Sequence, residues 1–190
     1  LSALASLFVF SLYVGNALAQ ETLFHAKYKG EISGFKIKGQ RILTEVGDGQ
    51  YTLDALAKNS FASLSEKSEF SLSDAYLKPQ SYRYERDILS FDAVKRIDFD
   101  WQAGLARYTR DDKPEKNKDL PLTLGTLDPS LYQLKLQSDL FNKGENFLYY
   151  FAKHKIKSLE FAYKGSTQFT LGKNTYDAIE IERINHPDKK

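Results

Sequence analysis

The sequence predicts a mainly β fold, a curved antiparallel sheet or half-open barrel of about 8–11 strands with one principal α-helix covering a face. Three observations support this prediction. Apolar and polar residues alternate in many segments, the chain holds 12 Tyr and 13 Phe, which favour strands, and one segment carries the start and stop signals of a helix. Turn residues between the alternating segments favour an antiparallel meander within one domain.

The alternation is clearest in four segments, 82–85, 96–101, 158–164 and 179–182. In the second of these, Ile97, Phe99 and Trp101 alternate with charged residues, which places apolar groups on one sheet face and charges on the other. Weaker strands are expected at 23–30, 34–46, 50–58, 67–73, 105–110 and 145–153. Within the last, residues 147–151 are apolar without interruption, so we expect a central strand covered on both faces.

The helix is expected over 129–142. Asp128 is suited to cap its N-terminus, Pro129 fits the first helical position, and Gly144 is suited to end it. Its apolar face is predicted to hold Leu131, Leu134, Leu140 and Phe141. Such a helix covers one face of a sheet.

The first residues have the pattern of a secretory signal peptide. Residues 1–19 carry no charge, residues 7–14 form an apolar run, and small residues at Ala17 and Ala19 suit a signal peptidase before Gln20. This predicts a leader over 1–19, a mature domain over 20–190 and a periplasmic location. The alternative is an uncleaved anchor, although the run is shorter than the ~20 residues that span a bilayer. Gln20 stands where a lipoprotein needs cysteine, so lipid attachment there is excluded.

The last residues also have an informative pattern. The predicted strand that ends near Ile184 leads into Asn185, His186 and Pro187, which are turn residues. A turn normally leads to another element, so we expect that a further strand follows and that the sequence is truncated at both ends.

Four segments in order resemble a known family. They are an aromatic opening strand at 24–28, a glycine-containing strand at 34–39, Lys-Pro-x-x-Tyr at 78–82 and Asp-Pro-Ser-Leu-Tyr at 128–132. Over about residues 23–184 this order resembles the DUF3108 family of bacterial envelope proteins. The resemblance implies an exported or periplasmic β-rich domain without an assigned activity, and a longer C-terminus. The architecture is also similar to the half-barrel lipoprotein carriers, in which a sheet and a helical lid enclose an apolar cavity.

No catalytic or metal-binding motif is found. Cysteine is absent, and His25, His154 and His186 have no partners at metal-ligand spacing. No G-x-S-x-G nucleophile motif occurs. The acid pairs Asp98/Asp100 and Glu180/Glu182 each share a strand face, which we interpret as the solvated one. We therefore predict a protein that is not an enzyme and that has no cofactor.

Charge gives no sign of a nucleic-acid or membrane partner. The net charge is only +2, and the basic segment 153–157 is interpreted as a solvated hairpin end. The aromatic surplus instead indicates an apolar ligand site beneath the helix. Its predicted residues are Phe99, Trp101, Leu131, Leu134, Tyr149, Phe151 and Phe161. A solid core formed by the same residues is the alternative.

The sequence thus favours a non-enzymatic envelope protein that binds a lipid, a lipoprotein or an extended peptide. The first alternative is a structural or assembly factor that acts through contact with another envelope protein. An envelope hydrolase is the third possibility.

Overall fold

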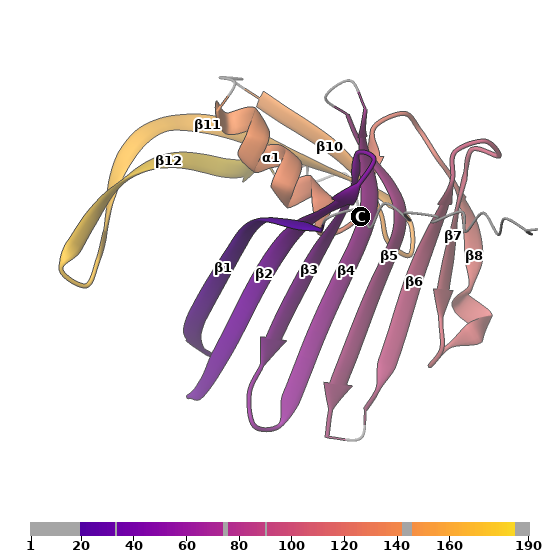
Figure 1. Ribbon diagram of the computed structural model, residues 1–190, viewed down its shortest axis with the longest axis horizontal. Coiled ribbons are helices and arrows are strands. Elements are labelled where there is room, and N and C mark those ends of the chain that lie inside the picture. The colour runs from indigo at the N-terminus through magenta and orange to yellow at the C-terminus, as the bar shows by residue number, and fades with distance from the viewer. Residues whose placement is uncertain (1–19, 33, 74–75, 90, 142–145, 185–190) are drawn as a thin grey trace, which may run out of the picture.

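A computed structural model describes residues 20–32, 34–73, 76–89, 91–141 and 146–184 (Figure 1). The predicted leader and the turn after Ile184 lie outside these residues. The first eight strands are β1 (Glu21–Ile32), β2 (Phe35–Gly47), β3 (Gln50–Lys58), β4 (Ala62–Ser73), β5 (Tyr76–Ile88), β6 (Ala93–Asp100), β7 (Leu105–Arg110) and β8 (Lys118–Pro121). They are followed by β9 (Thr126–Leu127), α1 (Leu131–Phe141), β10 (Asn146–Ala152), β11 (Ile156–Leu171) and β12 (Asn174–Ile184), with a 3₁₀ turn, η1 (Pro114–Lys116), before β8.

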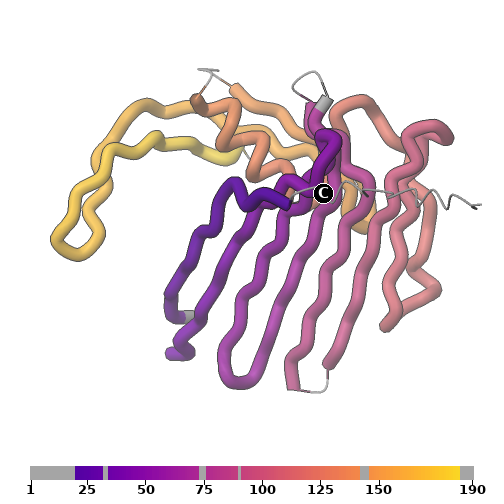
Figure 2. The backbone as a smooth tube through the Cα atoms, viewed as in Figure 1, coloured from indigo at the N-terminus to yellow at the C-terminus, as the bar shows by residue number. Residues whose placement is uncertain are grey.

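The first eight strands form one antiparallel meander in chain order. The sheet is curved and open, with β1 and β8 at its two edges (Figures 1 and 2). The turn between β2 and β3 shows how local sequence makes consecutive strands pair. Gly47, Asp48 and Gly49 all have positive φ angles, as a tight hairpin requires. The predicted curved antiparallel sheet with one principal helix is confirmed.

A second sheet of four strands has the order β12-β11-β10-β9. Its pair β9–β10 is parallel across two residue pairs, Tyr150 with Thr126 and Phe151 with Leu127, which the meander prediction did not include. Among the described residues β12 pairs only with β11 and is therefore an edge strand. The β11–β12 hairpin extends well away from the rest of the chain (Figure 1).

The predicted cap of the helix is present, although α1 begins at Leu131, two residues after the predicted start at Pro129. Asp128 Oδ1 accepts hydrogen bonds from the backbone N–H groups of Ser130 and Leu131, each at 2.8 Å, and so caps the N-terminus. The predicted apolar face was wrong in part. Leu131 and Leu136 are the buried residues of α1, whereas the side chain of Phe141 is 77% exposed. Phe141 is the last residue of α1, five positions after the buried Leu136. The predicted stop at Gly144 lies outside the described residues.

The prediction that the strand at 147–151 is covered on both faces was also wrong. In β10 the exposure alternates, with Phe147, Tyr149 and Phe151 buried and Leu148 51% exposed. β10 does lie between two neighbouring strands, but only one face of its sheet packs on the core. A continuous apolar run therefore does not by itself distinguish a two-sided strand from a one-sided one.

The buried residues fall into two clusters. The larger lies between α1, the second sheet and one half of the first sheet, and includes Leu53, Phe70, Leu127, Leu131, Leu136, Phe147, Tyr149, Phe151 and Leu159. The smaller lies between β5 to β8 and the end of β10, and includes Tyr82, Ile97, Phe99, Ala106, Tyr108, Leu120 and Ala152. Both clusters lie on the same face of the first sheet, which is here called the inner face. The helix and the second sheet cover this face near one end of its strands only (Figure 1).

Candidate functional site

An apolar pocket of about 530 Å³ lies beside α1 on the inner face. This α1 pocket is lined from the sheet by Leu23, Phe24, Leu43, Tyr51, Phe70, Leu72 and Leu77, and from the helix by Leu134, Lys135, Gln137, Ser138 and Phe141. Its volume lies within the range of pockets that hold small molecules.

The register of the sheet explains why these side chains meet. Phe24 is opposite Leu43, and Tyr51 is opposite Phe70, so strands β1 to β4 place these apolar side chains in two neighbouring rows on the inner face. The rings of Tyr51 and Phe70 stack with centroids 5.5 Å apart. The floor of the pocket is therefore formed by paired strands of the sheet.

The mouth of the pocket is apolar as well. Leu23 and Leu72 are each 47% exposed, and Phe141 extends from the last turn of α1 into solvent. Exposed large apolar residues around a hollow indicate a surface that a ligand or partner covers.

Polar contacts fix α1 to both sheets. Just before the helix, Ser130 Oγ donates to Glu66 Oε2 of β4, and in its first turn Gln133 Oε1 accepts from Arg41 Nη1 at 3.4 Å. Further along, Tyr149 Oη donates to Asp139 Oδ2 at 2.7 Å, which joins the helix to β10. The α1 pocket lies on the side of the helix that these contacts leave open.

One carboxyl group is fully buried at the start of the helix. Burial raises the pKa of Asp128 to about 7, and the charge of nearby Glu66 adds to this rise. Asp128 Oδ2 has no hydrogen-bond partner among the described residues. Because Asp128 has no exposed surface, no substrate reaches it in this conformation, and its contacts are those of a helix cap.

The seven predicted ligand-site residues do not form one site. Leu134 lines the α1 pocket. Leu131, Tyr149 and Phe151 are buried in the larger core cluster, and Phe161 packs against it. Phe99 and Trp101 belong to the smaller cluster, where their rings stack at 6.2 Å and Trp101 Nε1 donates to the carbonyl oxygen of Pro79 at 2.7 Å.

The sequence interpretation missed the sheet half of the pocket. Leu43, Tyr51 and Phe70 lie in segments that were expected as weaker strands, because their polar neighbours interrupt a simple alternation. The available signal was the turn at 47–49, since a tight hairpin fixes the register and places Leu43 and Leu53 on one face.

The remaining candidates occupy solvated positions. Asp98 and Asp100 are exposed, and Asp100 Oδ1 accepts a hydrogen bond from the N–H of Ala103 in the following turn. Glu182 pairs with Lys164 at 2.6 Å, and exposed His25 bonds Gln40. In the ranges that the structure describes, no three His, Asp or Glu residues gather to hold a metal ion. No helix in these ranges is long and apolar enough to span a membrane.

Comparison with known proteins identifies one family. The model of a family described as "Protein of unknown function (DUF3108)" matches residues 24–190. The chain belongs to the DUF3108 family. No curated protein and no solved structure matches this DUF3108 chain. The expected family is therefore confirmed, and the function rests on the site itself.

Proposed function

We propose that this DUF3108 protein is a non-enzymatic, exported protein of the cell envelope that binds an acyl chain or a similar hydrophobic ligand in the α1 pocket. The observation that carries this proposal is the apolar pocket of about 530 Å³ between α1 and the inner face. Export is supported by the leader pattern at 1–19.

The character of the lining supports a hydrophobic ligand. The sheet contributes only aliphatic and aromatic side chains, while the polar Lys135, Gln137 and Ser138 lie on the helix side. An acyl chain thus finds an apolar floor and a polar margin for its head group. Asp128, whose carboxyl is the buried one with a raised pKa, does not line the pocket.

The test uses a substitution at the mouth of the pocket. Leu72→Asp places a charge on the lining, so it is expected to lower the affinity for a fluorescent long-chain fatty acid at least tenfold. Because Leu72 is about half exposed, the free energy of unfolding should fall by less than about 1 kcal/mol. Leu124→Asp is the matched control, since Leu124 is 89% exposed and lies outside the pocket.

The comparison is made by fluorescence titration of the purified chain, with urea denaturation of each variant in parallel. Equal affinities for the parent and Leu72→Asp, or no fatty-acid binding by the parent, would contradict a ligand site at α1. Equal losses in both variants would show that the binding is not located in the pocket.

A second function, contact with another protein, is favoured by the β11–β12 hairpin. Its outer half is exposed on nearly all side chains and carries Phe169, Leu171, Tyr176 and Ile179. Within the part of the chain that the structure describes, one edge of β12 has no partner strand, and another protein's strand is able to pair with it. Successive backbone N–H groups of a strand point to alternate edges, so one of the two variants Ile179→Pro and Glu180→Pro removes a donor from the free edge. That variant should abolish capture of a partner from the periplasm without changing fatty-acid binding.

A further inference from the structure

The end of the first sheet that lies farthest from α1 forms a row of hairpin tips. In a meander every second turn lies at the same end, so the turns β1–β2, β3–β4 and β5–β6 stand side by side along one rim (Figure 1). This distal rim is separate from the α1 pocket, which lies at the other end of the same strands.

The distal rim exposes large apolar side chains at each of these three turns. They are Phe35 at β1–β2, Phe61 at β3–β4, and Ile88, Leu89 and Phe91 at β5–β6. Phe61 is 56% exposed and Phe91 is 72% exposed. Phe35 and Phe61 pack edge to face with ring centroids 5.9 Å apart, so two neighbouring tips share one aromatic surface. A cluster of exposed large apolar side chains is uncommon on a protein surface that contacts only water, and it marks a site of interaction.

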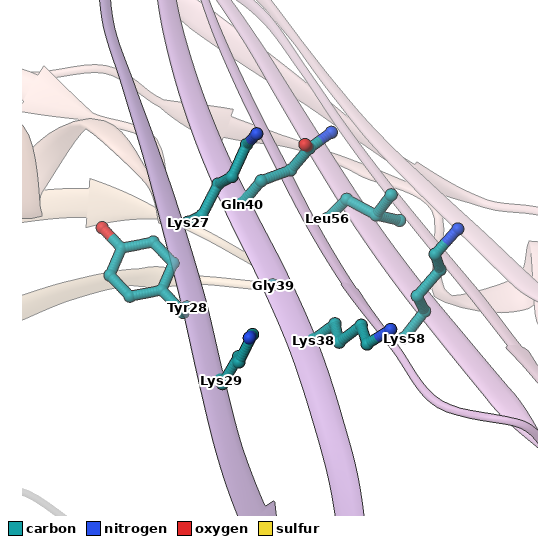
Figure 3. Close-up of a pocket in the computed structure, with 8 residues that line it drawn as sticks. All are labelled: Lys27, Tyr28, Lys29, Lys38, Gly39, Gln40, Leu56 and Lys58. Atoms are coloured by element: carbon teal, nitrogen blue, oxygen red, sulfur yellow. The ribbon is translucent and has the colours of Figure 1, made fainter.

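Three lysines lie a few residues from these tips, on the face of the sheet opposite to the inner face, here called the outer face. Lys29 of β1 is directly opposite Lys38 of β2, and Lys38 is directly opposite Lys58 of β3. With Lys27, these residues line a hollow of about 520 Å³ around Gly39 (Figure 3). Tyr28 also lines this hollow, but its ring points to the other side of β1, because successive side chains of a strand alternate (Figure 3).

The arrangement of the lysines is costly for the fold. Like charges placed directly opposite in a sheet destabilise it, and within the described residues none of Lys29, Lys38 and Lys58 makes an ion pair. All three are exposed. Lys36, by contrast, has Glu31 opposite it. A row of lysines without acidic partners is suited to bind an anion from outside the protein.

The apolar tips and the lysine row are spaced to act together. Phe35 and Lys38 are three residues apart, as are Lys58 and Phe61, which is roughly 10 Å along a strand. That is close to the depth between the acyl boundary and the phosphates of a bilayer. Long lysine side chains also reach toward phosphate groups while their stems stay in contact with apolar surface.

We propose that the distal rim docks on the surface of an anionic phospholipid bilayer. The tips with Phe35, Phe61 and Phe91 enter the acyl boundary, and Lys29, Lys38 and Lys58 contact the phosphate groups. The inference goes beyond ligand binding in the α1 pocket, and it does not depend on it. The net charge of only +2 gave no sign of a membrane partner. Attraction to an anionic membrane, however, depends on the charges that lie next to its surface, which here are a local cluster of lysines.

The test is co-sedimentation of the purified chain with vesicles. The parent is expected to bind vesicles of phosphatidylcholine with phosphatidylglycerol and to bind pure phosphatidylcholine vesicles much more weakly. High salt should reduce binding to the anionic vesicles. The triple variant Lys29→Gln, Lys38→Gln, Lys58→Gln is expected to lose on the order of 100-fold in partition coefficient. The double variant Phe61→Ser, Phe91→Ser is expected to lose at least tenfold.

The matched control removes three lysines elsewhere. Lys153→Gln, Lys155→Gln, Lys157→Gln makes the same change in net charge at the β10–β11 hairpin and should leave vesicle binding unchanged. The lysine-row variant should also melt no lower than the parent, because it removes like-charge contacts.

Three results would overturn the proposal. One is equal binding of the parent to neutral and anionic vesicles, or no binding to either. Another is an equal loss in the two lysine variants, which would indicate an effect of total charge. The third is unchanged binding of the phenylalanine variant, which would show that the tips do not enter the bilayer.

Discussion

The hydroxyl group of Ser130, the residue that precedes α1, donates a hydrogen bond to Glu66 Oε2 of β4. The two residues are 64 positions apart in the chain, and the contact holds the start of the helix against the inner face. The start of α1 therefore lies over the core. The side of the helix that carries Leu134 faces the α1 pocket.

Removing this contact should destabilise the fold. Ser130→Ala leaves a partly buried carboxylate oxygen without its donor, which is expected to lower the free energy of unfolding by about 1–3 kcal/mol. The measurement is urea denaturation followed by circular dichroism. Ser60→Ala, at an exposed turn position, should change stability little, and a similar loss in both variants would refute the role given to Ser130.

The buried carboxyl of Asp128 should make stability depend on pH. Its pKa is raised from a usual value near 4 to about 7 in the folded protein, chiefly by burial. Between these values the folded state binds more protons than the unfolded state, so the free energy of unfolding falls as pH rises from about 4 to about 7. Asp128→Asn retains a capping side chain and should remove this part of the slope. Parallel curves for parent and variant, from denaturation at several pH values, would contradict the assignment.

The core and the pocket should respond differently to truncation. Tyr149→Ala removes a buried ring and its bond to Asp139, and it should cost about 3–5 kcal/mol. Leu72→Ala, at the half-exposed mouth, should cost less than about 1 kcal/mol and still weaken fatty-acid binding. Phe161→Ala, which packs against the same core, should resemble Tyr149→Ala. If Tyr149→Ala and Leu72→Ala proved equally mild, the division into core and pocket would be wrong.

The leader pattern at 1–19 gives a prediction that is independent of the fold. The small residues at Ala17 and Ala19 predict that the protein recovered from the periplasm begins at Gln20. N-terminal sequencing checks this directly. Recovery of the uncleaved chain in a membrane fraction would instead support an anchor.

The sequence by itself determined the elements that depend on neighbouring residues. The alternation at Ile97 and Phe99, the hairpin turn at 47–49 and the cap at Asp128 each act over a few positions, so their structures were predictable. The same local signals misplaced Phe141, because helical spacing does not say where a covering surface ends.

Only the tertiary structure decided which side chains from distant segments share a surface. Trp101 and Leu134 looked like parts of one site, yet they lie in different places because curvature and register divide the inner face between two clusters. In the sequence, Lys29, Lys38 and Lys58 are far apart and form no motif. They form a row only because three strands pair in one register. Periodicity is set by neighbouring residues, whereas register and the covering of a face depend on how the strands and the helix pack. Register and packing therefore decide where the α1 pocket and the lysines near the distal rim lie.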